Sequence, residues 1–283
     1  MRGFDRLVFL LLIIAVTYVA VRDFAEPGER RPPPDVHTSP QGTLAAPSAG
    51  DPMITIEAER KRGNSTGTAF SIDDDGIWLT ARHVTSGCRE IWLQTGRQRG
   101  LPALRVYEHP TADVAVVITR RGSPPIALSA ALDNGQEGFH FGYPRGRPGE
   151  AHSQLLGHAR LRTVGMRRHV EPIVAWAELR RHPGNLDALS GMSGGPVLDG
   201  SGNSVGVTIA TSRRRGRVFT AAPRSIRETL QQAGVQGEAE LGSGARDELN
   251  GQDFPSYGDA LRTELTVAKV ICLVANKGRR PSF

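Results

Sequence analysis

Cysteines, aromatic residues and long apolar runs are all scarce in this chain of 283 residues. It has two cysteines, and neither these nor the eight histidines show the spacing of a zinc site. Aromatic residues make up 6% of the chain, and none is interleaved with the arginines at 167–168 and 213–215 as in a single-strand nucleic-acid binder. We therefore expect no metal, no cofactor and no nucleic acid, and interpret the arginine clusters as solvated loops.

Turn-forming residues are abundant, with 33 glycines and 19 prolines, whereas apolar residues at helical spacing are rare. Short runs of alternating apolar and polar residues predict strands in the first part of the chain at 54–58, 67–72, 77–81, 90–94, 103–107 and 113–118. In the second part they predict strands at 138–141, 153–161, 173–179, 196–198, 204–209 and 218–221. The expected fold is all-β, with two six-stranded antiparallel barrels at about 53–124 and 125–232.

The longest apolar run covers residues 7–21 and follows two arginines. This pattern predicts a signal peptide or an uncleaved signal anchor over 1–22, with export of the remaining chain. Small residues are badly spaced for cleavage, so we favour a single-pass anchor with a periplasmic or extracytoplasmic domain over a secreted or periplasmic protein. Residues 23–52 are rich in proline and predict a disordered linker.

Three further segments follow the last predicted strand. Pro223 opens a short predicted helix over 223–232, in which Ile226 and Leu230 lie four residues apart. Residues 233–258 are rich in polar and small residues and predict a flexible linker. Residues 259–276 predict an amphipathic helix that docks on the domain, although the apolar run at 265–275 also fits a strand.

The segment Gly191-Met192-Ser193-Gly194-Gly195-Pro196 carries the strongest chemical signal. Its glycines allow a sharp turn whose N–H groups approach a reacting atom, while Ser193 offers a nucleophile. The alternative is an ordinary glycine-serine turn between strands. All eight histidines precede Ser193, which excludes the α/β-hydrolase order and leaves the order histidine, aspartate, serine.

Two residues complete that order. His83 follows the strand predicted at 77–81 and can act as a general base, although a single histidine is more often structural. Asp113 opens a long apolar run, where a charge needs a partner. Orienting His83 would explain this carboxylate, and capping a strand edge would explain it equally well.

Together these segments resemble the chymotrypsin-like serine proteases, especially the bacterial HtrA/Deg branch. The resemblance covers residues 54 to about 232, and it depends on the segments at 80–84, 113–117, 141–144, 191–196, 205–207 and 219–223. It implies that His83 is the base, Asp113 orients it, and Ser193 is the nucleophile. The N–H groups of Gly191 and Ser193 would form the oxyanion hole.

Three departures from the family pattern limit what carries over. Met192 stands where the digestive enzymes have an aspartate that pairs with a new N-terminus, so we expect no activation by cleavage. We expect no PDZ-like segment after the domain, since the remaining residues, about 50, are too few for one. Asp187, six residues before Ser193, would select basic side chains in a trypsin-type pocket narrowed by Thr211, but it also fits an ordinary loop residue.

The two cysteines, Cys88 and Cys272, form an even pair in a chain expected to be exported. They are candidates for a disulfide that fastens the C-terminal segment beside His83, the alternative being two unpaired thiols. The sequence as a whole predicts a membrane-tethered serine endopeptidase that acts on proteins or peptides. The alternative is an inactive module of the same fold that binds a peptide or a protein partner.

Overall fold

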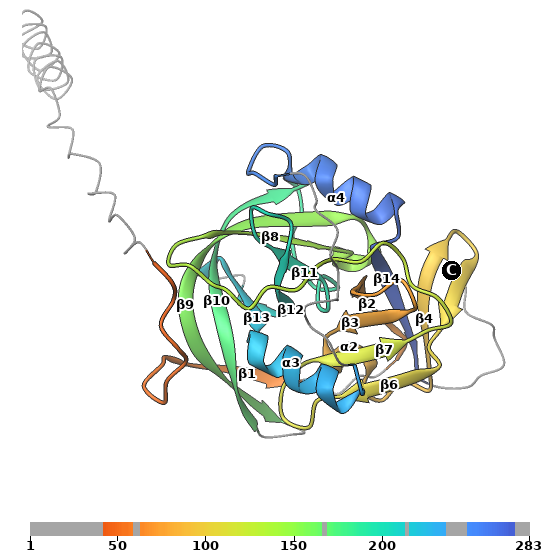
Figure 1. Ribbon diagram of the computed structural model, residues 1–283, viewed down its shortest axis with the longest axis horizontal. Coiled ribbons are helices and arrows are strands. Elements are labelled where there is room, and N and C mark those ends of the chain that lie inside the picture. The colour runs from red at the N-terminus through yellow and green to blue at the C-terminus, as the bar shows by residue number, and fades with distance from the viewer. Residues whose placement is uncertain (1–41, 59–62, 166–168, 213–214, 236–247, 275–283) are drawn as a thin grey trace, which may run out of the picture. The chain divides into compact units, whose positions relative to one another are not determined.

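The computed structural model describes residues 42–58, 63–165, 169–212, 215–235 and 248–274. Its strands form two barrel-like sheets, antiparallel apart from one added strand, with few helices, which confirms the predicted fold class (Figure 1). The predicted anchor at 1–22 and the first part of the linker at 23–52 lie outside the described residues. Among the residues described, no helix is long and apolar enough to cross a membrane.

The second barrel is closed by hydrogen bonding. Its strands run in the order β9-β10-β13-β12-β11-β8, and β8 pairs with β9 to close the ring. These strands are β8 Glu137–Gly142, β9 Gly149–Gly165, β10 His169–His182, β11 Pro196–Leu198, β12 Ser204–Ser212 and β13 Arg217–Ala221. The strand β1, Met53–Ala58, adds to the outside of β9 in parallel. Residues 54–58 therefore belong to the second sheet, and their assignment to the first barrel was wrong.

The first sheet is an open half-barrel in the order β5-β4-β14-β2-β3-β7-β6. Its strands are β2 Ser65–Ser71, β3 Ile77–Thr80, β4 Glu90–Gly96, β5 Arg99–Pro102, β6 Arg105–Glu108, β7 Ala115–Ile118 and β14 Val267–Leu273. The C-terminal strand β14 thus lies between β2 and β4. Both of these neighbours come from the early part of the domain. The first sheet is complete only with residues from the end of the chain.

This strand corrects the helix predicted at 259–276. The observed helix α4, Phe254–Thr263, begins earlier, inside the predicted linker 233–258. It ends before Leu265, whose φ of 60° is the left-handed conformation that terminates helices. The next seven residues, VAKVICL, include β-branched side chains buried on both faces, as in a central strand. Helix α3 spans Pro223–Gln232, as predicted.

Residues 42–52 correct the second part of the predicted linker. The N–H of Leu44 donates to the carbonyl oxygen of Leu132 at 2.7 Å, and Thr43 bridges to Asp133. The Leu44 side chain packs against the core of the second barrel. This segment therefore belongs to the folded domain.

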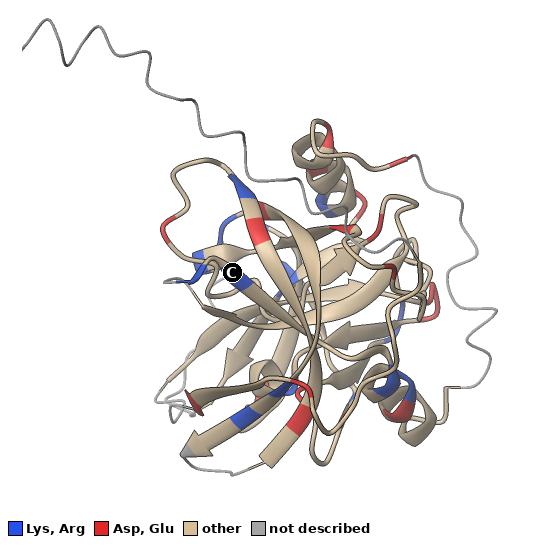
Figure 2. Cartoon of the chain, turned by 90° about the vertical axis from the view of Figure 1, so that its left-hand side faces the viewer, with Lys and Arg blue, Asp and Glu red and all other residues tan. Residues whose placement is uncertain are grey.

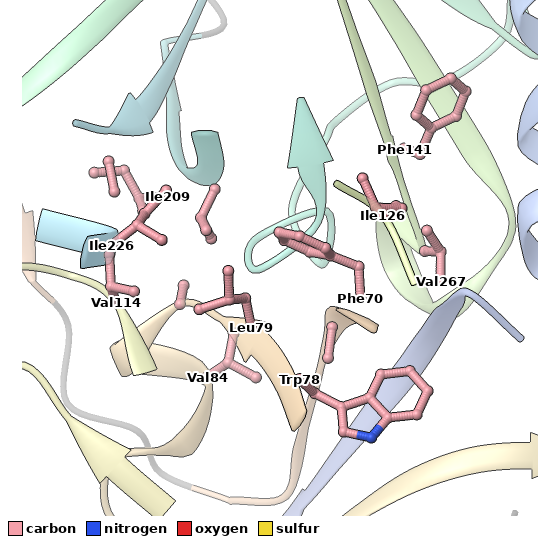
Figure 3. Close-up of a cluster of buried hydrophobic side chains, with 14 of the residues drawn as sticks. Phe70, Trp78, Leu79, Val84, Val114, Ile126, Phe141, Ile209, Ile226 and Val267 are labelled. Carbon is pink, nitrogen blue, oxygen red and sulfur yellow. The ribbon is translucent and has the colours of Figure 1, made fainter. Parts of the chain in front are cut away.

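The two sheets share one apolar core, which brings their facing loops together. Figure 3 shows Leu79, Val84 and Val114 of the first half opposite Ile209 of β12 and Ile226 of α3. Burial of these side chains stabilises the contact between the halves. Helix α4 packs on the second barrel, where its Arg262 pairs with the buried Glu150 of β9.

Candidate active site

His83 lies in a short helix, α2, which spans Arg82–Thr85 directly after β3. Two neighbouring side chains fix this turn. The guanidinium of Arg82 donates to the carbonyl oxygens of His109 and Pro110 at 2.8 and 2.9 Å. The hydroxyl of Thr85 donates to Glu108 at 2.8 Å. The backbone that carries His83 is therefore tied to the loop that leads to β7.

Asp113 lies at the end of that loop and makes two hydrogen bonds with His83. The His83 N–H donates to Oδ1 at 2.8 Å, and Nδ1 lies 2.6 Å from Oδ2. Because an ionised carboxylate only accepts, the imidazole proton resides on Nδ1 and Nε2 carries the basic lone pair. The His83 side chain is 49% exposed and that of Asp113 16% exposed. The base thus faces solvent while its partner is largely covered.

The Asp113 carboxyl remains ionised despite its burial. Burial alone would raise its pKa. The charge and hydrogen bonds of His83, together with the charge of Arg82, lower the pKa by more than burial raises it, so the pKa of Asp113 lies below its usual value. An ionised Asp113 stabilises a protonated His83. This arrangement suits a histidine that takes up a proton during a reaction.

Ser193 lies in a tight loop that rests on the first sheet. Gly191 and Gly194 have φ values of 99° and 88°, which only glycine adopts readily. The N–H of Thr68 in β2 donates to the carbonyl oxygen of Ser193 at 2.9 Å. A Cβ on Gly194 would collide with the Thr68 carbonyl and lie 3.0 Å from the Ala81 nitrogen, which directly precedes α2. The loop is thereby pressed against the base of the helix that carries His83.

A second close approach places Ser193 beside α2. A Cβ on Gly67 would lie 2.6 Å from Val84 Cγ1 and 3.2 Å from the Ser193 carbonyl oxygen. Val84 is the neighbour of His83 in the chain. The structure therefore joins His83 and Asp113 through hydrogen bonds, while the backbone of Ser193 packs on β2 close to Val84 of α2.

The peptide groups around Gly191 are held by partners on both sides. The Arg145 N–H donates to the Ser190 carbonyl oxygen at 2.7 Å, so the N–H of Gly191, on the other side of this planar peptide, points away from Arg145. The Thr68 hydroxyl donates to the Gly191 carbonyl oxygen at 2.8 Å. Arg145 has a φ of 52°, a strained conformation for a residue with a side chain. Sequence reasoning missed Thr68 and Arg145, because neither lies in a motif.

A buried carboxyl, Glu171 of β10, also reaches this site and was not predicted from the sequence. Its Oε2 accepts the Asp113 N–H at 2.7 Å, although 58 residues separate the two in the chain. Burial, followed by the charge of Asp113, raises the pKa of Glu171 to about 8. The one available signal was the charge itself, placed in a strand that is otherwise apolar on its inner face.

The two residues predicted to set specificity lie at the surface. The Asp187 side chain is 67% exposed, and its Oδ2 lies 3.8 Å from Nη1 of Arg145. Thr211 is an exposed residue of β12. An ion pair between two solvated side chains contributes little to stability. A role for Asp187 and Thr211 in selecting a substrate side chain stays a prediction.

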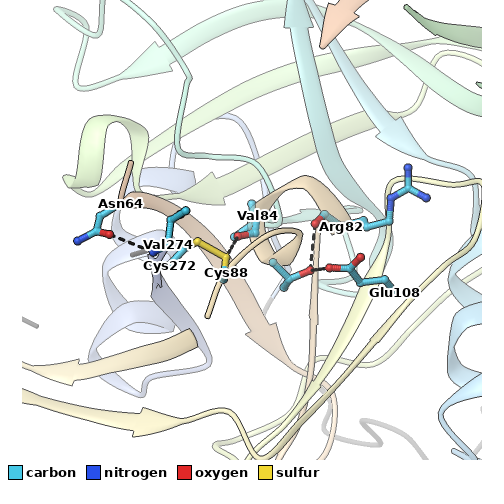
Figure 4. Close-up of a disulfide and its surroundings, with 8 residues drawn as sticks. Asn64, Arg82, Val84, Cys88, Glu108, Cys272 and Val274 are labelled. Atoms are coloured by element: carbon cyan, nitrogen blue, oxygen red, sulfur yellow. Dashed lines mark hydrogen bonds between the residues drawn. A yellow bond between two sulfur atoms is a disulfide. The ribbon is translucent and has the colours of Figure 1, made fainter. Parts of the chain in front are cut away.

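Cys88 and Cys272 form a disulfide, with their Cα atoms 5.4 Å apart (Figure 4). The bond joins β14 to the segment between α2 and β4. The amide of Val274, just after β14, donates to the Asn64 side chain at 3.1 Å. The C-terminal strand is thus fastened at the end nearest the helix of His83.

Charged residues of both signs are interspersed over the strands and helices (Figure 2). Acidic and basic residues frequently neighbour each other, as in the pairs Arg181–Glu178 and Arg224–Glu228. The excess of six positive charges in the sequence is therefore accompanied by acidic residues close to many of the basic ones.

Fold and residue placement together define a class, the chymotrypsin-like double-barrel proteins. Residues 67–207 match the trypsin-like peptidase domain, and the chain belongs to this family. A crystal structure of an inactive form of Rv3671c from M. tuberculosis H37Rv has a TM-score of 0.50 at 20% identity, over 62% of this chain and 86% of that chain. That likeness shows the fold.

Two curated proteins are similar in sequence. A probable periplasmic serine endoprotease, DegP-like, from Hahella chejuensis is 28% identical over 174 residues, which are 59% of this chain and 34% of that protein. The uncharacterized protein y4bJ from Sinorhizobium fredii is 30% identical over 164 residues, 57% of this chain and 24% of that protein. The chain thus spans only about a quarter of the length of y4bJ and about a third of the length of the DegP-like protein. The DegP-like relative agrees with the resemblance to the HtrA/Deg branch.

Proposed function

We propose that this protein is a serine endopeptidase that hydrolyses peptide bonds through His83, Asp113 and Ser193. The observation that carries the proposal is the pair of hydrogen bonds from His83 to Asp113, formed where the Ser193 loop packs on β2 and α2. Membership of the trypsin-like peptidase family supports a protease. The assignment of roles to these three residues is our own.

In the proposed reaction, the Ser193 hydroxyl attacks the carbonyl carbon of the scissile peptide bond while His83 Nε2 takes its proton. His83 then gives this proton to the leaving amine, and an acyl group remains on Ser193. A water molecule, deprotonated by His83, then attacks the acyl carbon. The bond from this carbon to the Ser193 oxygen breaks, His83 returns the proton to that oxygen, and the acyl group leaves as a carboxylic acid. Asp113 stays ionised and holds the imidazole in the tautomer that has its basic lone pair on Nε2.

The developing negative charge on the substrate oxygen needs donors that are already in place. We assign this role to the N–H groups of Gly191 and Ser193. Support comes from the Ser190 carbonyl, which faces Arg145 and so turns the Gly191 N–H the other way. The fixed Gly191 carbonyl, bonded to Thr68, holds the next peptide of the loop.

We place the protein on the extracytoplasmic side of the membrane. The apolar run at 7–21 would serve as the anchor or signal. The disulfide fits an oxidising compartment, and the DegP-like relative is described as periplasmic. Recovery of the full-length protein in washed membranes, with the domain sensitive to protease added to spheroplasts, tests this placement.

A fluorophosphonate probe tests the chemistry, because it reacts with an activated serine whatever peptide the enzyme prefers. We expect the full-length protein to be labelled on Ser193 and to cleave casein, and Ser193→Ala to do neither. Ser190→Ala, which alters a serine in the same loop, is the matched control and should still be labelled. A folded wild-type protein that the probe leaves unmodified would contradict the proposal and favour the inactive binding module.

A further inference from the structure

Glu171 is a buried carboxyl that belongs to one half of the fold and binds the other. It lies in β10 of the second barrel and is 2% exposed. Its Oε2 accepts the N–H of Asp113 at 2.7 Å. Asp113 lies just before β7, a strand of the first sheet. Burying a carboxyl is unfavourable, and an apolar residue at this place would leave the Asp113 N–H without this acceptor. We therefore infer that Glu171 does more than fill space in the core.

Among the residues that the structure describes, few charged groups face this carboxyl. Asp113 lies on one side, and the guanidinium of Arg82 in α2 acts on it as a favourable charge. On its own strand, Nε2 of His169 lies 3.3 Å from Oε1. On the neighbouring strand β9, the residue paired with Glu171 is the apolar Leu161. Glu171 thus lies between the amide of Asp113 and the imidazole of His169.

We propose that Glu171 is a positioning residue for the proposed catalytic reaction, because its carboxyl holds the backbone of Asp113 at the point from which Asp113 orients His83. Asp113 is bound at two places. Its carboxylate binds His83, and its amide binds Glu171. Since Glu171 comes from the second barrel, which also carries Ser193, it links the position of the base to the half of the fold that holds the nucleophile.

The protonation state of Glu171 follows from its surroundings. Burial and, second, the negative charge of Asp113 together raise its pKa to about 8, against the smaller effects of the Asp113 amide and Arg82. At pH 7 the carboxyl is therefore mostly neutral, and its Oε2 still accepts the amide proton. Above pH 8 a second negative charge forms beside Asp113, and the two carboxylates repel each other.

Two substitutions separate positioning from simple packing. Glu171→Gln keeps a neutral group of the same shape with an acceptor oxygen, whereas Glu171→Leu removes the acceptor. With the fluorophosphonate probe at pH 7, we expect Glu171→Gln to keep the maximal labelling rate within about threefold and Glu171→Leu to lower it about tenfold or more. The probe concentration for half-maximal rate should change little in either. Glu178→Gln, a carboxyl of the same strand that pairs with Arg181, is the matched control.

The pH profile distinguishes the role of this carboxyl from a structural one. We expect the labelling rate of the wild type to fall as pH rises through about 8, and this step to be absent in Glu171→Gln. Equal rates for Glu171→Leu and the wild type, or an unchanged alkaline step in Glu171→Gln, would overturn the inference.

One readout needs no catalysis and so separates this inference from the proposed function on which it rests. The backbone amide resonance of Asp113, followed by NMR in the full-length protein, should titrate with a midpoint near 8 in the wild type and not in Glu171→Gln. If Ser193 is never labelled but this titration occurs, the proposed function is wrong and the Glu171–Asp113 coupling stands. If Ser193 is labelled and the titration is missing, the inference is wrong and the proposed function stands.

Discussion

The hydroxyl of Thr68 donates a hydrogen bond of 2.8 Å to the carbonyl oxygen of Gly191. The same hydroxyl accepts the N–H of Tyr143 at 3.0 Å, and the Thr68 backbone N–H binds the carbonyl oxygen of Ser193. One residue of the first sheet therefore holds the loop on both sides of Met192. Because the loop itself belongs to the second barrel, its shape depends on how the two halves dock.

Replacing Thr68 with valine tests this dependence. Valine has the same shape but can neither donate to Gly191 nor accept from Tyr143, so the loop should lose its fixed position. We expect Thr68→Val to lower the rate of fluorophosphonate labelling about tenfold or more, because donors to the oxyanion must be preorganised. Thr68→Ser keeps the hydroxyl and should react at nearly the wild-type rate.

Equilibrium unfolding in urea provides the control for this pair. Thr68 is wholly buried, and we expect Thr68→Val to lower the free energy of unfolding by about 1–3 kcal/mol while leaving the protein folded. A folded Thr68→Val variant that is labelled at the wild-type rate would show that the hydroxyl does not position the loop.

Local patterns were enough to predict most strands and α3. Alternating burial marks β4, and Pro223 at the start of α3 with Ile226 and Leu230 on one face marks the helix. The strand β5 escaped prediction because it is only Arg-Gly-Leu-Pro, with two residues that disfavour strands. Its place is set by pairing with β4, which no local pattern records.

For the site, too, local sequence predicts some residues, whereas others are found only from the tertiary structure. His83, Asp113 and Ser193 lie in recognisable motifs, so the sequence alone could nominate them. Glu171 and Thr68 contact these residues across the interface between the two halves. Their immediate sequence shows at most the charge of Glu171 among apolar neighbours and does not show which residue it contacts. The error at 259–276 has a related cause, because Val267–Leu273 is apolar enough for either a helix or a strand, and the gap between β2 and β4 decides.

Two truncations test the part that β14 plays in the fold. A chain that ends at residue 264 lacks β14, so β2 and β4 lose their shared neighbour and Gly67 and Leu93 lose the pairing with Val270. Edges exposed in this way favour aggregation. We expect this chain to be insoluble or to lack the dispersed NMR spectrum of a folded protein. The matched control ends at residue 274, keeps β14, and should fold. A folded, soluble chain ending at 264 would contradict the assignment.

We expect the chain to fold without the disulfide, but to be less stable once folded. It closes a loop of 184 residues, which in the chain-entropy model stabilises the folded state by about 5 kcal/mol. Since β14 is also held by backbone hydrogen bonds, we expect the double variant Cys88→Ser with Cys272→Ser to fold but to melt at a lower temperature. Dithiothreitol should lower the melting temperature of the wild type and leave that of the double variant unchanged. Equal melting temperatures for the two proteins would contradict this expectation.

His140 should make the second barrel sensitive to acid. It is fully buried, and its Nε2 lies 2.8 Å from the Ser153 hydroxyl, which itself donates to the Gly138 carbonyl. Nε2 must therefore carry the proton, and Nδ1 accepts from the Thr208 hydroxyl at 3.1 Å. Burial, followed by the charge of His152, lowers the pKa of His140 from 6.5 to about 3.

The sign of the effect follows from where the proton binds more tightly. Between pH 6.5 and 3 the unfolded chain protonates this histidine and the folded one does not, so stability is complete above 6.5 and is lost as the pH falls toward 3. The loss from this group approaches about 1.4 kcal/mol per pH unit. His140→Gln keeps a donor and an acceptor without a titrating group, so its urea midpoint should fall less steeply over this range than that of the wild type. His182→Gln, at an exposed histidine, should follow the wild type. If His140→Gln shows the same acid dependence as the wild type, the neutral buried imidazole is not what makes the domain acid-sensitive.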